Sequence, residues 1–225
     1  MAHEITGRYA KVQNTRAYFD ECGSDIPLIC IHMGWAYSLQ WQYFMPIMAD
    51  AGFHVIAPDL PGHAKSYPVN WTPFKKMYDY SEWVWNFIAA VCPEQKPVVC
   101  GSGIGGDMTP QIACNHPGGI RAGMVIESHW PHRATYQETC VADMDAWNDH
   151  DVRDKLQQIT CPIFMFKGEA DYHVPDQDVR DTMAAIPAGL AEGGIAKGMG
   201  HLIMMEDPQG LAAACLGFLR RRKII

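Results

Sequence analysis

A glycine-rich turn between an apolar run and a helical segment constrains the fold of this chain more than any other feature. The turn covers residues 101–106, Gly-Ser-Gly-Ile-Gly-Gly, and follows the apolar run Pro97–Cys100. The segment Asp107–Asn115 comes next and has a helical pattern. A short apolar run bounded by turn residues predicts a buried strand, and glycine permits the sharp turn that leads from it into a helix. The sequence therefore predicts a strand–turn–helix unit near the middle of the chain.

Apolar runs alternate with helical segments along the rest of the 225 residues. We predict strands at Pro27–Ile31, His54–Pro58, Pro97–Cys100, Ala122–Ile126, Ile163–Phe166 and near Gly194–Ala196, after a leading hairpin of Arg8–Val12 and Thr15–Phe19. We predict helices at Leu39–Ala51, Tyr80–Val91, Asp107–Asn115, Thr135–Asn148, Asp151–Ile159, Asp176–Ala185 and Pro208–Arg221. This alternation predicts an α/β fold, in which helices cover both faces of a mostly parallel sheet.

Composition excludes several classes of partner. The formal net charge of −7 argues against a nucleic-acid surface, and no apolar run approaches the roughly 20 residues of a membrane span. The first four residues lack the basic and apolar parts of a signal peptide, and the eight cysteines show no zinc-binding spacing. We therefore expect one cytoplasmic domain, residues 1–225, with no membrane and no nucleic acid as partner. The sequence leaves the oligomeric state open.

Four further motifs follow predicted strands. They are His-Met-Gly-Trp at 32–35, Pro-Asp-Leu-Pro-Gly-His-Ala-Lys-Ser at 58–66, Lys-Gly-Glu-Ala-Asp-Tyr-His-Val-Pro at 167–175, and Lys-Gly-Met-Gly-His-Leu at 197–202. In parallel sheets the reactive groups lie on loops after the carboxyl ends of the strands. We therefore expect these motifs and the glycine turn to meet at one edge of the sheet.

In type and in order, the five motifs resemble those of the α/β-hydrolase superfamily, over nearly the whole chain. The resemblance implies the α/β-hydrolase fold with a reduced cap at residues 127–159, and an esterase- or lactonase-like member. It also implies that the glycine turn is the nucleophile elbow, Gly-x-nucleophile-x-Gly. Gly101 and Gly105 then flank the turn, and the nucleophile position falls on Gly103.

The resemblance further implies a catalytic acid, a base and an oxyanion hole. Asp171 matches the acid and His201 the base, while the backbone N–H groups of Gly34 and Ile104 match the oxyanion donors. Met33 stands where the family usually has glycine.

Two alternatives concern the acid and the nucleophile. Glu127 follows the Ala122–Ile126 run, where some members carry their acid. Ser102 is a weaker candidate nucleophile, since Cys100 and Ile104 would then replace the flanking glycines.

The nucleophile position raises the main question, because glycine has no side chain that could attack a substrate. We interpret Gly103 as a serine-to-glycine replacement that inactivates a hydrolase of carboxylic esters, lactones or related acyl compounds. A second hypothesis is a non-covalent enzyme in which His201 acts as base for a lyase, a carbon–carbon cleavage or a cofactor-free oxygenation. A third is an inactive binding or scaffold protein. We expect no metal or organic cofactor, a small acyl substrate, and a pocket lined by Trp35, Trp130 and Trp147.

Overall fold

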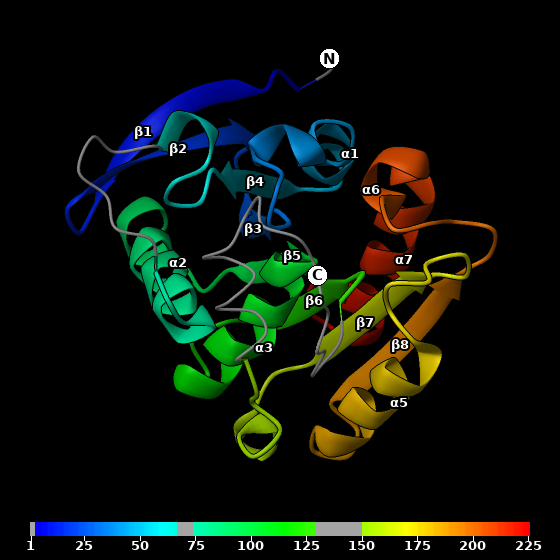
Figure 1. Ribbon diagram of the computed structural model, residues 1–225. Coiled ribbons are helices and arrows are strands. Elements are labelled where there is room, and N and C mark those ends of the chain that lie inside the picture. The colour runs from blue at the N-terminus through cyan, green and yellow to red at the C-terminus, as the bar shows by residue number, and fades with distance from the viewer. Residues whose placement is uncertain (1–2, 67–73, 129–149) are drawn as a thin grey trace.

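The computed structural model describes residues 3–66, 74–128 and 150–225, which contain an eight-stranded sheet (Figure 1). The strands lie in the order β1-β2-β4-β3-β5-β6-β7-β8. Their bounds are Thr6–Val12 (β1), Thr15–Cys22 (β2), Ile26–Ile31 (β3), Phe53–Pro58 (β4), Val98–Ser102 (β5), Ala122–Ile126 (β6), Ile163–Gly168 (β7) and Ala191–Ala196 (β8). β1 pairs antiparallel with β2, and β2 pairs antiparallel with β4, whereas all other pairs are parallel. The predicted hairpin and the mostly parallel sheet are both confirmed.

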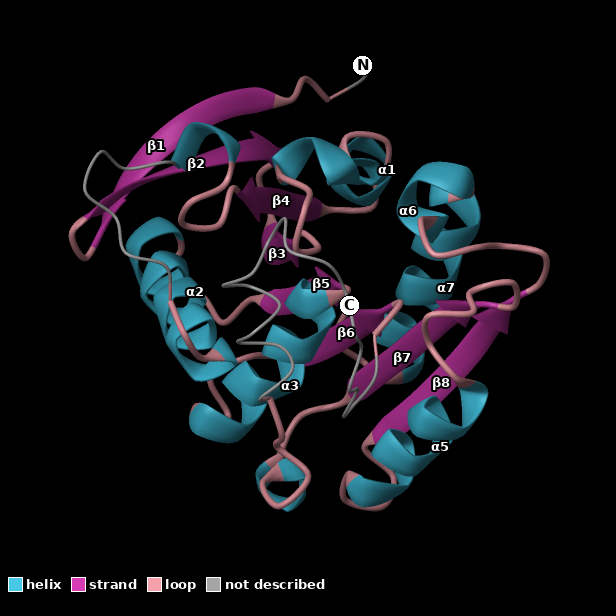
Figure 2. Cartoon of the chain, viewed as in Figure 1, coloured by secondary structure: helices cyan, strands magenta, loops and turns pink. Residues whose placement is uncertain are grey.

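Helices cover both faces of this sheet (Figure 2). The α-helices are Phe44–Asp50 (α1), Met77–Val91 (α2), Ile104–Asn115 (α3), Asp176–Ala185 (α5), Ile203–Glu206 (α6) and Pro208–Arg221 (α7). Short 3-10 helices lie at Ser38–Trp41, Ala64–Ser66 and Leu156–Gln158. The predicted bounds of α5 and α7 are confirmed, and α7 begins with Pro208 after Asp207, whose side chain accepts from the Gly210 N–H.

Two separate apolar cores result from the alternation of side chains along the central strands. Ile29 and Ile31 of β3 pack into one core with α2 and α3, while Leu28 and Cys30 pack into the other with α1 and α7. Successive side chains of a strand point to opposite faces, so a central strand must be apolar throughout. This explains why the predicted strands are continuous apolar runs.

Two helix predictions were wrong in extent, and α2 and α3 each begin three residues earlier than predicted. The segment 39–51 contains a 3-10 turn followed by the shorter α1, and the segment 151–159 contains only the 3-10 turn Leu156–Gln158. In the second case the Asp151 carboxylate accepts from the backbone N–H of Arg153, a local bond that competes with helix formation. The predicted helix at 135–148 and most of the cap segment lie outside the described residues.

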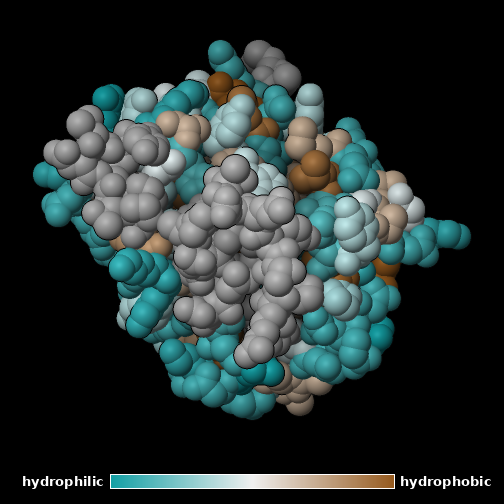
Figure 3. Space-filling view, in the orientation of Figure 1, coloured by the Kyte–Doolittle hydropathy of each residue, from teal (hydrophilic) through white to brown (hydrophobic). Residues whose placement is uncertain are grey.

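The surface shown in Figure 3 is mostly hydrophilic away from the grey atoms, with apolar residues in small, separate groups. Among the described residues, no helix combines the length and the apolar character needed to cross a membrane.

Candidate active site

The glycine turn connects the end of β5 to the start of α3 in a single residue. Gly103 has φ +55° and ψ −124°, a conformation that is strained for residues with a Cβ. Its N–H donates to the carbonyl of Ile126 in β6, and its own carbonyl accepts from the N–H of Asp107 in α3. The turn therefore has the strand–turn–helix form that the sequence predicts, and the sheet and the helix both hold it.

The two glycines that flank the turn allow a close approach of backbone to backbone. A Cβ on Gly101 would lie 1.8 Å from the carbonyl oxygen of Gly105. A Cβ on Gly105 would lie 2.5 Å from the carbonyl oxygen of Ile31 at the end of β3. The first turn of α3 thus packs directly on the ends of two strands, where no side chain fits.

Met33 occupies the space that a side chain at position 103 would enter. A Cβ built on Gly103 would lie 2.9 Å from the Cβ of Met33, closer than such atoms approach in proteins. Met33 is buried, and its backbone N–H donates to Oε1 of Gln40 at 3.0 Å. The preceding His32 is also buried and accepts from the Leu60 N–H at 2.9 Å. These bonds hold the loop after β3 in place, with Met33 facing Gly103.

The two residues predicted to supply the oxyanion donors, Gly34 and Ile104, are neighbours. A Cβ on Gly34 would lie 3.5 Å from Cδ1 of Ile104. Ile104 is the first residue of α3, so its N–H has no partner within the helix. The Gly34 carbonyl accepts from Nε2 of His63 at 2.6 Å, which fixes the orientation of that segment.

Ser102 lies within β5 and is fully buried. The residue pairs across the sheet with Ile126. Its hydroxyl has no hydrogen-bond partner among the described residues. A buried hydroxyl without a neighbouring base is a poor nucleophile.

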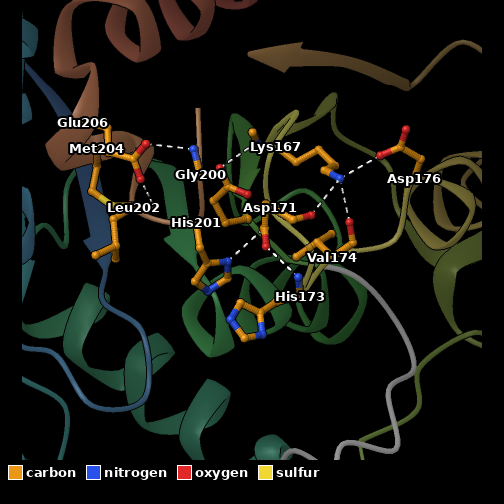
Figure 4. A network of polar contacts seen from close by, with 12 residues as sticks. Lys167, Asp171, His173, Val174, Asp176, Gly200, His201, Leu202, Met204 and Glu206 are labelled. Carbon is orange, nitrogen blue, oxygen red and sulfur yellow. Dashed lines mark hydrogen bonds and ion pairs between the residues drawn. The ribbon is translucent and has the colours of Figure 1, made fainter. Parts of the chain in front are cut away.

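Asp171 and His201 meet across the loops that follow β7 and β8 (Figure 4). Nδ1 of His201 lies 2.8 Å from Oδ2 of Asp171, and the other oxygen, Oδ1, accepts from the His173 N–H at 2.8 Å. Burial disfavours the Asp171 carboxylate, but hydrogen bonds from His201, Glu127 and the His173 N–H outweigh it and lower the pKa of Asp171 below its usual range. The two residues that the sequence placed 30 positions apart therefore form a charge-assisted pair.

A buried lysine shapes the loop that carries Asp171. Nζ of Lys167, in β7, donates to the carbonyls of Asp171 and Val174 and to Oδ1 of Asp176 (Figure 4). Sequence reasoning missed this residue. The only signal was a lysine at the end of an apolar run, directly before the acid motif.

The loop of His201 has its own support. The carboxylate of Glu206 accepts from the backbone N–H groups of Gly200 and Leu202, on either side of the histidine (Figure 4). A Cβ on Gly168 would lie 2.3 Å from the carbonyl of Met199, so this loop packs against the start of the acid loop.

Glu127 lies behind the pair, at the end of β6. Its backbone has φ +51°, and its Oε1 accepts from the Gly168 N–H at 2.7 Å. Burial, together with the hydrogen bond to Asp171 and the charge of that residue, raises the pKa of Glu127 to about 10. A group with this pKa is neutral at physiological pH.

One cluster of the described residues brings three side chains within reach of a common cation. Single donor atoms of Glu127, Asp171 and His201 all lie within 4.8 Å of one another. Asp171 and His201 already bond to each other, and this arrangement suits proton transfer better than metal binding.

The predicted pocket residues are placed only in part. Trp35 follows Gly34 and has 63% of its surface exposed, so its indole is accessible to a ligand. Trp130 and Trp147 lie outside the described residues.

Comparison with known proteins gives one family. The model of the alpha/beta hydrolase fold family matches residues 26–138. An AB hydrolase superfamily protein of Gibberella zeae is 27% identical over 93 residues, which are 40% of this chain and 31% of that protein. A soluble epoxide hydrolase of a Corynebacterium species is 40% identical over 63 residues, 28% of this chain and 21% of that protein. The matches thus span less than a third of either relative.

Solved structures with the same fold align over almost the whole chain. A membrane phospholipase A has a TM-score of 0.85 at 18% identity, with 97% of this chain and 87% of that chain covered. A carboxylesterase from Bacillus subtilis has a TM-score of 0.77 at 16% identity, with 96% of this chain and 92% of that chain covered. At such identities the likeness concerns the fold.

Proposed function

This chain belongs to the alpha/beta hydrolase fold family, and from this premise we propose that it hydrolyses a carboxylic ester, lactone or related acyl compound with water as the nucleophile. His201 would act as the base, with Asp171 as the residue that orients it. The N–H groups of Gly34 and Ile104 would hold the oxyanion. Hydrolysis is supported by the named activities of similar proteins, an epoxide hydrolase and a carboxylesterase, and the second of these also supports an acyl substrate.

The observation that carries the proposal is the contact between positions 33 and 103. A serine at 103 needs a Cβ, and that Cβ would meet the Cβ of Met33 at 2.9 Å. Replacing a serine by glycine in a working enzyme would leave the space of the Cβ open. Here the neighbouring residue is larger where the family usually has glycine. The pair Met33 and Gly103 is therefore better explained as a fitted pair than as an inactivating replacement.

The proposed reaction needs only proton transfers that this site can supply. His201 accepts a proton from water through Nε2 while the water oxygen bonds to the acyl carbon. Asp171 accepts from Nδ1 and stabilises the imidazolium. When the tetrahedral intermediate collapses, the bond to the leaving oxygen breaks and His201 returns the proton to that oxygen. Water takes the place of a nucleophilic side chain, so no acyl-enzyme forms.

The experiment measures hydrolysis of a short-chain p-nitrophenyl ester and of a panel of lactones. Gly103→Ser alone is expected to gain little, because its Cβ meets Met33. The double variant Met33→Gly/Gly103→Ser removes that Cβ and is expected to form an acyl-enzyme with burst kinetics. The matched control is Met33→Ala/Gly103→Ser, which shortens the side chain but keeps the conflicting Cβ.

Three outcomes would overturn parts of the proposal. Full activity in Gly103→Ser alone would mean that Met33 yields, and would support the inactivated-hydrolase interpretation. If His201→Ala turns over substrate as fast as the wild type, His201 is not the base. No turnover in any correctly folded variant would favour a binding or scaffold role.

A further inference from the structure

Glu127 adopts a backbone conformation that its residue type disfavours. It is the first residue after β6 and has φ +51°, the left-handed region that glycine adopts most easily. Its N–H donates to the carbonyl of Phe166 in β7, so the sheet holds the backbone there. Strain of this kind persists where the surrounding structure needs the side chain in one place. Here that place is the interior behind Asp171, where only 1% of Glu127 is exposed.

The two oxygens of Glu127 have unequal surroundings. Oε1 accepts from the Gly168 N–H at 2.7 Å. Oε2 is buried and has no donor among the described residues, and the Asp171 carboxyl lies within reach, so the two carboxyls can share a hydrogen bond when one of them carries a proton. Two ionised carboxylates can only accept, so they cannot bond to each other. A proton between them removes both the unpaired oxygen and the repulsion of like charges.

The proton belongs on Glu127 rather than on Asp171. Asp171 accepts from the ring of His201 and from the His173 N–H, two bonds that favour its ionised form. Among the described residues, a single backbone group, the Gly168 N–H, donates to Glu127. Lys167 is a nearby cation, and its Nζ is bound to Asp176 and to two carbonyls.

We propose that Glu127 is a positioning residue that stands in the site as a neutral carboxylic acid and donates its Oε2 proton to Asp171. This bond fixes the Asp171 carboxylate against rotation, with Oδ2 directed at Nδ1 of His201. It also leaves a single negative charge behind the imidazole instead of two. The inference rests on the proposed function only for the catalytic role of His201. Its support also includes the raised pKa of Glu127, about 10. Among the described residues, Lys167, His173 and His201 are the titratable neighbours of the Glu127–Asp171 pair.

The test is infrared spectroscopy of the full chain labelled with carbon-13 glutamate. At about pH 7 we expect the carbonyl band of a neutral carboxylic acid, shifted by the label and absent from Glu127→Gln. Proton NMR of the His201 Nδ1–H, assigned by its loss in His201→Ala, reports the position of Asp171. Glu127→Gln is expected to keep this resonance, because the amide can donate to Asp171 while its oxygen accepts from Gly168. Glu127→Met, which has similar length and no donor, is expected to shift it.

Several results would overturn the proposal. Without a neutral-acid band at about pH 7, Glu127 is ionised. A band that appears only after EDTA treatment means that the cluster holds a cation instead of a proton. An unchanged His201 resonance in a folded Glu127→Met shows that Glu127 does not position Asp171. None of these signals requires turnover, so the two proposals can fail separately. If the protein is inactive but shows the band, the proposed function is wrong and the role of Glu127 still holds.

Discussion

The turn at Gly103 and the loops of Asp171 and His201 lie at the same edge of the sheet, but different parts of the chain hold them in place. At the turn the backbone holds the structure in place, because carbonyls and N–H groups of β3, β5, β6 and α3 approach one another where no Cβ fits. In the acid–base loops polar side chains do so: the buried Lys167 and Glu127 and the exposed Glu206 bind the backbone around the reactive pair. The turn should therefore be sensitive to added atoms, and the loops to lost hydrogen bonds.

The largest effect is expected from removing the base. If His201 is the base, His201→Ala should lower the rate of ester hydrolysis about 10³-fold or more, as the loss of a catalytic histidine does in other hydrolases. The variant also leaves Oδ2 of the buried Asp171 without its donor, so we expect a loss of about 1–3 kcal/mol in unfolding free energy. Steady-state rates and urea unfolding of the same preparation check both statements. A larger loss of stability would mean that His201 has a structural role in its loop.

The second largest effect is expected on stability, from adding one methyl group at the turn. Gly101→Ala places a Cβ 1.8 Å from a backbone oxygen that cannot move independently, and we expect a loss of about 4 kcal/mol or a failure to fold. The control is Gly52→Ala, at φ +92° with nothing within 4 Å of the new Cβ, where only backbone strain of about 1–2 kcal/mol is expected. Equal losses in the two variants would show that close approach does not distinguish the turn.

Lys167→Met tests the loop side of the comparison. The methionine keeps the buried stem and removes three contacts of Nζ, so we expect a loss of about 2 kcal/mol in unfolding free energy and a lower turnover rate. Lys96→Met, at an exposed position, is the control and should be nearly neutral. If both variants unfold at the same urea concentration, Lys167 does not hold the loop.

Glu127→Gln tests a defined pH dependence of stability. Glu127 keeps its proton in the folded protein up to about pH 10 but loses it above its ordinary pKa of 4.5 when unfolded. The folded state then binds more protons, so the stability of the wild type relative to Glu127→Gln should fall by about 1.4 kcal/mol per pH unit between these values. Unfolding of both proteins at about pH 6 and about pH 8 measures the slope. Parallel stability curves would show that the folded and unfolded states titrate alike at this residue.

The ionised Asp171 has the opposite dependence. Its pKa is depressed in the folded state, so its contribution to stability is present above the ordinary pKa of an aspartate and is lost as the pH falls through the lower, folded value. Comparing the two slopes separates the acid that carries the proton from the acid that carries the charge.

Local patterns in the sequence were sufficient for most of the sheet and for the turn. Continuous apolar runs marked the central strands, because these are buried on both faces, and the bounds of α5 and α7 followed from their polar starts and their periodicity. Helix prediction was weaker at 151–159, where the Asp151 carboxylate takes a local bond that periodicity does not show. The family resemblance predicts an oxyanion segment, an acid and a base, and the structure brings the predicted acid Asp171 and the predicted base His201 into contact.

The sequence by itself determined the α/β architecture, the glycine turn and the absence of a side chain at position 103, since each depends on neighbouring residues or on composition. Only the tertiary structure decided what surrounds that position. Met33 and Gly103 are 70 positions apart, and Glu127, Lys167 and Asp171 come from separate loops and strands. Their distances depend on how the strands align at one edge of the sheet, and a pKa such as that of Glu127 depends on burial and on neighbouring charges, neither of which is encoded within a short stretch of residues.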